Sequence, residues 1–151
     1  MTDPTPSLAL RKADSETLDR IEELLDANGL PHEAVRSSPE CFYVARSGGA
    51  LVGIGGVERY GSAGLLRSVA VPAPMRGAGY GTALCDALEE RARVDGVETL
   101  YLLTTTAAEF FARRGYERVG REAAPERVRG TSQFADRCPD SATCMRKRLD
   151  G

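Results

Sequence analysis

The sequence has no tryptophan, a single histidine and only two lysines among its 151 residues, and its net charge is −2. A net charge so close to zero gives no electrostatic basis for binding nucleic acid or an anionic membrane. No apolar run has the length that a membrane-spanning helix needs, and residues 1–10 lack the basic and apolar pattern of a leader peptide. We therefore expect a cytoplasmic protein that binds neither nucleic acid nor a membrane.

Cysteine is also sparse, and the positions of its four residues show no C-x-x-C spacing. They are Cys41, Cys85, Cys138 and Cys144. Zinc sites usually draw on closely spaced pairs of cysteine or histidine, so we expect no metal site. Scattered cysteines in a cytoplasmic chain are usually reduced thiols that pack in the core.

The length of the chain is typical of one domain with a sizeable core. Residues 1–7 contain two prolines and are expected to form a disordered tail, which leaves a single domain over residues 8–151. Apolar spacing predicts strands at residues 8–11, 41–45, 50–58, 65–71, 98–103, 116–119 and 143–149. Helices are predicted from Asp14 to Asn28 and at residues 30–36, 82–94, 107–114 and 125–131.

This order of elements predicts an α/β protein with a central mixed sheet and helices on both faces. A helical crossover joins residues 65–71 to residues 98–103, so these two strands are expected to pair in parallel. Glycine-containing turns at residues 47–49 and 61–64 predict that the three strands between residues 41 and 71 form an antiparallel meander.

The most informative segment is residues 69–82, with the sequence VAVPAPMRGAGYGT. An apolar run ends at prolines, and Gly77, Gly79 and Gly81 then alternate before a helical pattern begins. The start of a helix carries unpaired N–H groups and the positive end of the helix dipole, and glycine lets a ligand approach closely. The segment therefore predicts a site for a phosphate or pyrophosphate, with a ligand-free glycine turn as the alternative.

Two common phosphate motifs do not match this segment. The dinucleotide fingerprint needs a glycine where Thr82 stands, and the P-loop needs a lysine that the segment lacks. A third pattern, R/Q-x-x-G-x-G/A, matches residues 76–81. With the valines and prolines before it, the segment resembles the acyl-CoA loop of the GNAT N-acetyltransferase superfamily. The resemblance implies the GNAT acyl-CoA N-acyltransferase fold and acetyl-CoA as cosubstrate.

Two further segments resemble particular groups within that superfamily. They are residues 102–116, LLTTTAAEFFARRGY, and residues 138–148, CPDSATCMRKR. Both are similar to the acetyltransferase domain of N-acetylglutamate synthases and to the small arsenic-resistance N-acetyltransferases. The resemblance implies transfer of an acetyl group to a small amino-acid-like amine, with a role in arsenic resistance. N-acetylglutamate synthesis and a degenerate acyl-CoA sensor are the alternatives, and a homodimer is implied.

The resemblance also assigns roles along residues 69–82. Backbone groups of Val69, Ala70 and Val71 are expected to hold the pantetheine arm, and an N–H of Val71 or Ala70 is expected to face the thioester oxygen. The pyrophosphate is expected to bind the following loop and helix start. Its residues are Arg76, Gly77, Ala78, Gly79, Tyr80, Gly81 and Thr82.

Transfer of the acetyl group requires a neutral amine. Because most amines are ammonium ions at neutral pH, a proton acceptor is needed. Glu58 is the nearest acidic candidate for this catalytic role, and a solvated strand carboxylate is the alternative. Relatives often place a tyrosine acid four residues before the Gly-Tyr pair, but Phe111 occupies that position here. The departing thiolate is then expected to leave with help from water or with none.

Four residues are predicted to contact the acceptor. Arg67 interrupts an apolar strand, where a substrate carboxylate would be a suitable partner, although an outward-facing arginine is the alternative. His32 lies in a segment that often lines the acceptor pocket of relatives, with a surface position as the alternative. Thr104 and Thr105 end a parallel strand, where they could contact a ligand or cap the next helix.

Overall fold

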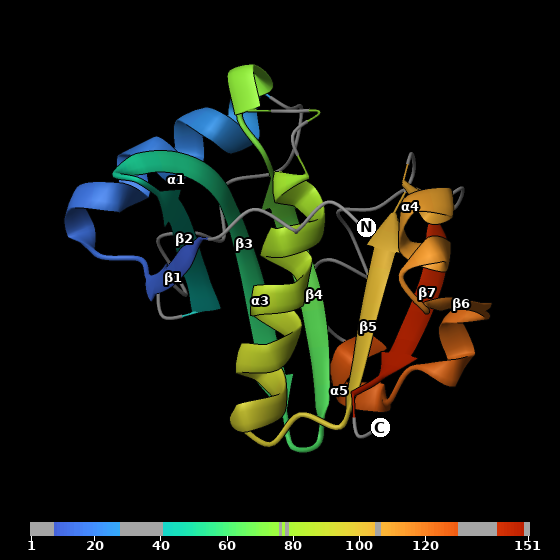
Figure 1. Ribbon diagram of the computed structural model, residues 1–151. Helices are drawn as coiled ribbons and strands as arrows, with labels where there is room; N and C mark the ends of the chain where they lie inside the picture. The colour runs from blue at the N-terminus through green and yellow to red at the C-terminus, as the bar shows by residue number, and fades with distance from the viewer. Residues whose placement is uncertain are drawn as a thin grey trace. The chain divides into compact units, whose positions relative to one another are not determined.

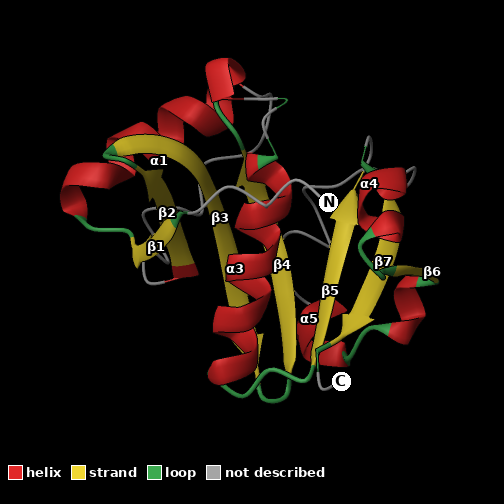
Figure 2. Cartoon of the chain, in the orientation of Figure 1, coloured by secondary structure: helices red, strands yellow, loops and turns green. Residues whose placement is uncertain are grey.

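The computed structural model describes residues 8–27, 41–75, 77, 79–104, 107–129 and 142–149 (Figures 1 and 2). The strands are β1 (Ala9–Lys12), β2 (Phe42–Ser47), β3 (Ala50–Tyr60), β4 (Ala63–Ala70), β5 (Thr99–Thr104), β6 (Glu117–Val119) and β7 (Thr143–Arg148). The helices are α1 (Ser15–Ala27), α3 (Tyr80–Val94), α4 (Ala108–Arg113) and α5 (Glu126–Arg129), with short 3-10 turns η2 (Ala73–Met75) and η3 (Arg121–Ala123). The predicted tail at residues 1–7 and the predicted helix at residues 30–36 lie outside the described residues.

The strands form one mixed sheet in the order β1-β2-β3-β4-β5-β7-β6. β4 and β5 pair in parallel, whereas β1–β2, β2–β3, β5–β7 and β6–β7 are antiparallel. The predicted mixed sheet and the predicted parallel pair are therefore confirmed. The chain divides into two compact units, residues 1–57 with 68–90 and residues 58–67 with 91–151.

In the first unit, α1 begins where Asp14 caps it. Asp14 Oδ1 accepts hydrogen bonds from the N–H groups of Glu16 and Thr17, each at 3.0 Å, which satisfies two donors that the helix start leaves open. The apolar face of α1 then packs against the sheet. This cluster comprises Leu18, Ile21, Leu25, Phe42, Val44, Leu51, Ile54 and Ala70.

Helix α3 approaches β3 closely because β3 has glycine at the two contact positions. A β-carbon at Gly53 would lie 2.7 Å from Leu84 Cδ2, and one at Gly55 would lie 2.5 Å from Leu88 Cδ1. Side chains alternate between the two faces of a strand, so Ile54 points to the opposite face from these glycines. Ile54 packs with the α1 cluster, and the two helices therefore cover opposite faces of β3.

In the second unit, a separate apolar cluster forms beneath α5. Its buried members are Ala63, Leu65, Tyr101, Ala124, Val128 and Cys144. Apart from this cluster, Phe111 of α4 is buried and meets Phe110 and Tyr116 edge-on at centroid distances of 5.1 and 5.3 Å. Among the residues that the structure describes, no helix is both long and apolar enough to cross a membrane.

The packing of α3 on β3 predicts that two substitutions on this helix lower the free energy of unfolding by different amounts. Leu88→Ala should lower the free energy of unfolding by about 2–5 kcal/mol, because it leaves a cavity against β3. Val94 lies on the same helix but is 64% exposed, so Val94→Ala should change that free energy by less than about 0.5 kcal/mol. Urea denaturation measures both values. Equal losses for the two variants would contradict the packing of Leu88 against β3.

Candidate functional site

Strand β4 differs along its length in its pairing with β5 and in its backbone conformation. Its parallel pairing with β5 covers Ala63, Gly64 and Leu65, while the strand itself continues to Ala70. Ser68 then has a φ of 57°, a left-handed conformation that is uncommon for any residue other than glycine. Such a residue redirects the backbone that follows it. The segment that the resemblance assigns to pantetheine, residues 69–71, begins immediately after this irregularity.

The loop after β4 brings exposed glycines to the start of α3. Gly77 and Gly79 have φ values of 86° and 87°, and both are exposed. Gly79 O accepts the N–H of Ala83 at 3.1 Å, so the helix begins at Tyr80. The N–H groups of the next three residues, 80–82, lie in the first turn, where an α-helix offers them no acceptor of its own.

This helix begins two residues before the predicted start at residue 82, which corrects the position of Tyr80 and Gly81 from loop to helix. A first turn tolerates glycine better than a helix interior does, because few intrahelical bonds have yet formed there. Thr82 is half-buried in the same turn. Arg76 and Ala78, the other predicted loop contacts, lie outside the described residues.

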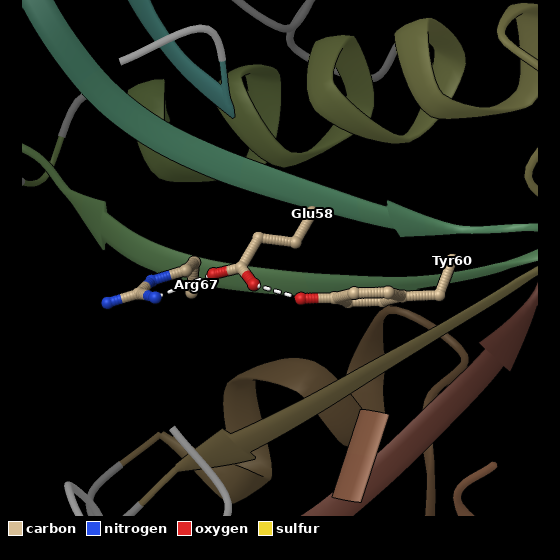
Figure 3. A network of polar contacts seen from close by, with 3 residues as sticks. All are labelled: Glu58, Tyr60 and Arg67. Carbon is tan, nitrogen blue, oxygen red and sulfur yellow. Dashed lines mark hydrogen bonds and ion pairs between the residues drawn. The ribbon is translucent and has the colours of Figure 1, made fainter. Parts of the chain in front are cut away.

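A polar network joins β3 to β4 at three side chains (Figure 3). Arg67 Nη1 donates to Glu58 Oε2 at 2.6 Å, and the Tyr60 hydroxyl donates to Glu58 Oε1. The Arg67 side chain is only 4% exposed and that of Glu58 is 17% exposed. Arg67 therefore faces inward, and Glu58 is a paired carboxylate rather than a solvated one.

The physical reason for this pair is the cost of removing a charge from water. A buried guanidinium is stable only with a partner that offsets its lost hydration, and the Glu58 carboxylate provides one. The sequence predicted the need for a partner of Arg67 but assigned it to a substrate. The contact with Glu58 and the role of Tyr60 were missed. Alternation along residues 58–60 was the available signal, since it places Glu58 and Tyr60 on one face of β3.

Of the three other residues predicted to contact the acceptor amine, the structure describes only Thr104. The Thr104 hydroxyl accepts the N–H of Ala107 at 3.0 Å, in the turn before α4. The residue at the N-cap of α4 is Ala107, and it has no side-chain cap, so Thr104 does not cap the helix itself. His32 and Thr105 lie outside the described residues. Phe111 and Tyr116 are packing residues, because both are buried and in edge-on contact with each other.

The described cysteines are free thiols: Cys41 is partly buried, and Cys85 and Cys144 are buried. Burial raises the pKa of the Cys144 thiol, which keeps it protonated and unreactive. Within the described part of the chain, no three side chains of the metal-binding types gather closely enough to hold a metal ion.

Residues 8–120 match the model of the acetyltransferase (GNAT) family, and the chain belongs to this family. It is 44% identical over 55 residues to an amino-acid acetyltransferase of Pseudomonas fluorescens, and 41% identical over 63 residues to one of Azotobacter vinelandii. These matches cover 36% and 42% of this chain but only 13% and 15% of those relatives.

Solved structures share the fold over most of the chain. N-acetylglutamate synthase of Neisseria gonorrhoeae, complexed with coenzyme A and N-acetyl-glutamate, has a TM-score of 0.82 at 23% identity, over 96% of this chain and 36% of that one. A Mycobacterium tuberculosis protein in complex with CoA has a TM-score of 0.78 at 24% identity, over 93% of this chain and 98% of that one. The predicted GNAT fold is confirmed.

The Glu58–Arg67 pair predicts an unequal response to substitution. Glu58→Leu should lower the free energy of unfolding by about 3–5 kcal/mol, because it leaves the buried guanidinium without its carboxylate. Arg67→Met should cost less, because the more exposed Glu58 can regain hydration. The double variant should recover part of the loss, since both charges are then gone.

Urea denaturation measures all three variants, and Glu117→Leu is the matched control. Glu117 pairs with Arg146 at 2.8 Å, but that ion pair is exposed and should matter little. A double variant whose loss equals the sum of the two single losses would contradict the interpretation of Glu58 and Arg67 as a mutually dependent pair.

Proposed function

We propose that this protein transfers an acetyl group from acetyl-CoA to the amine of a small amino-acid-like acceptor. The observation that carries the proposal is the exposed left-handed turn at Gly77 and Gly79, which leads directly into the first turn of α3. Backbone N–H groups at a helix start suit a phosphate ligand. Membership of the GNAT family and a shared fold with CoA complexes support acetyl-CoA as that ligand.

In this proposal the cosubstrate is held mainly by backbone. The pyrophosphate binds the N–H groups of residues 76–81, with the Arg76 side chain and the Thr82 hydroxyl as further donors. The pantetheine arm lies along Val69, Ala70 and Val71. This use of backbone explains why glycine, which adds no side chain, recurs in the loop.

The proposed reaction forms one C–N bond and breaks one C–S bond. The lone pair of the neutral amine attacks the thioester carbon, and coenzyme A departs as its thiolate. An N–H of Val71 or Ala70 stabilises the developing oxyanion, and such a donor contributes roughly 3 kcal/mol in comparable enzymes. Phe111 offers no proton to the leaving group, so the thiolate leaves with help from water or with none.

The Glu58–Arg67 pair supports an amino acid as the acceptor. An α-amino acid carries one positive and one negative group, and the pair offers one of each sign. Arg67 would bind the acceptor carboxylate, while Glu58 would take the proton that its ammonium must lose. A guanidinium has five N–H donors and a carboxylate about four acceptor positions, so both groups can make several contacts at once.

Three finer expectations remain predictions: a role in arsenic resistance, a homodimer, and a cytoplasmic location. The relatives named amino-acid acetyltransferase support an amino acid as the acceptor. The N-acetyl-glutamate bound in the Neisseria gonorrhoeae structure is the reason to include glutamate as a second candidate, which would make this an N-acetylglutamate synthase-like enzyme. An acceptor assay separates a role in arsenic resistance from N-acetylglutamate synthesis, because each implies a different acceptor.

Release of free CoA thiol over a panel of acceptors tests the proposal. The panel pairs each amino acid, glutamate and arsenical amino acids included, with the matching amine that lacks the carboxylate. We expect turnover of amino acids, and for Arg67→Met a rise of about 10-fold or more in the acceptor KM with the acetyl-CoA KM unchanged. Turnover of no acceptor would overturn the proposal, and tight acetyl-CoA binding without turnover would indicate a sensor.

The cosubstrate loop gives a second test. Gly79→Ala should raise the acetyl-CoA KM by about 5- to 30-fold, because a residue with a β-carbon pays roughly 1–2 kcal/mol to hold the left-handed conformation that binding requires. Gly48→Ala is the matched control. Gly48 has a φ of 58° in the β2–β3 turn, with no atom within 4 Å of an added β-carbon. Gly48→Ala should lower the stability of the protein without changing the acetyl-CoA KM. An equal rise in the acetyl-CoA KM for both variants would contradict the assignment of the loop at Gly79 to acetyl-CoA.

A further inference from the structure

The Glu58 carboxylate is held at both of its oxygens, by donors from two strands (Figure 3). Arg67 on β4 donates to Oε2, and Tyr60, two residues further along β3, donates to Oε1. Two donors on different oxygens restrict rotation of the carboxyl group about its terminal bond, whereas a single donor would leave it free to turn. The orientation of the carboxylate therefore depends on Tyr60 as well as on Arg67.

Tyr60 is itself fixed by its surroundings. Its ring packs against the cluster beneath α5, which includes Leu65 and the fully buried Val128. Arg127 of α5 lies over the same ring, with its Cζ atom 5.4 Å from the centroid. A hydroxyl on an immobilised ring can direct a hydrogen bond to one place at little cost in conformational entropy.

We propose that Tyr60 is a positioning residue for acetyl transfer, whose hydroxyl holds Glu58 in the orientation that receives the acceptor's proton. This inference rests on the proposed function. One ammonium proton passes to a Glu58 oxygen, and the freed lone pair attacks the thioester carbon. The nitrogen of the tetrahedral intermediate then loses a second proton to water as the thiolate of coenzyme A departs. Tyr60 keeps its own proton throughout, and Glu58 afterwards returns the acquired proton to solvent.

The proposal assigns the positioning role to the hydroxyl of Tyr60 and only packing to its ring. Tyr60→Phe keeps the ring and its packing but removes the donor to Oε1, so the half-buried carboxylate gains alternative rotamers. A displacement of about 1 Å in a reacting group can reduce the rate by about 100-fold. The change should therefore affect kcat, while contacts of acetyl-CoA with residues 69–82 stay as they were.

A double-mutant cycle on kcat tests this role in the full chain. We expect Tyr60→Phe to lower kcat by roughly 10- to 100-fold, with the acetyl-CoA KM within about 2-fold of the wild type. In a Glu58→Gln background, the same change should lower kcat by less than about 3-fold, because the carboxylate to be positioned is gone. Tyr101→Phe is the matched control: Tyr101 belongs to the same cluster but lies opposite Arg146 on β7.

The outcomes distinguish the two proposals. An equal loss of kcat from Tyr60→Phe in both backgrounds would mark a merely structural residue and overturn the positioning role, as would an unchanged kcat or a similar loss from Tyr101→Phe. In each of these cases the wild-type turnover leaves the proposed function standing. Absence of turnover by the wild type on the whole panel overturns the proposed function, and the positioning role falls with it.

Discussion

The packing of α3 against two glycines of β3 is the constraint on which the loop before α3 depends. Gly53 and Gly55 leave room on β3, and Leu84 and Leu88 occupy it. The helix axis is thereby set by its closest contacts in the core. Because α3 begins at Tyr80, directly after the left-handed Gly79, the same contacts also fix where its first-turn N–H groups lie. The position of the loop therefore depends on how α3 packs in the core.

A second constraint acts on the other unit, where charge rather than packing decides the arrangement. Arg67 interrupts an apolar stretch of β4 and is buried, so the fold must supply an acceptor close to its guanidinium. Glu58 supplies it from the neighbouring strand, and Tyr60 completes the group. A purely apolar choice at these positions would often be as stable or more stable than a buried ion pair. Stability of the fold alone therefore does not require opposite charges at this place.

Much of the fold could be predicted because its signals are local. Helical spacing of apolar residues predicted α1, α3 and α4, and the crossover through α3 was enough to predict the parallel pairing of β4 with β5. The glycine loop was predicted for the same reason, since its residues are consecutive. The start of α3 was placed two residues late because glycine disfavours a helix interior, yet Gly81 lies in the first turn.

The candidate site was less predictable, because it depends on contacts between segments. No local pattern assigns Arg67 to Glu58, since the contact requires the two strands in register. Tyr60 lay two residues beyond the predicted end of its strand at residue 58, and only the fold brings its hydroxyl to a carboxylate. Ser68 carried no signal for a left-handed conformation, because serine adopts it rarely and only where the surrounding structure imposes it.

The two glycines of β3 have a consequence for how this chain can change over generations. A larger residue at Gly53 or Gly55 would meet the side-chain tip of Leu84 or Leu88, which would have to shift. These positions lie more than twenty residues before the loop in the sequence, yet a substitution at either one would disturb side chains of the helix that the loop leads into. A change in β3 would therefore bear on the start of α3 as well as on the core.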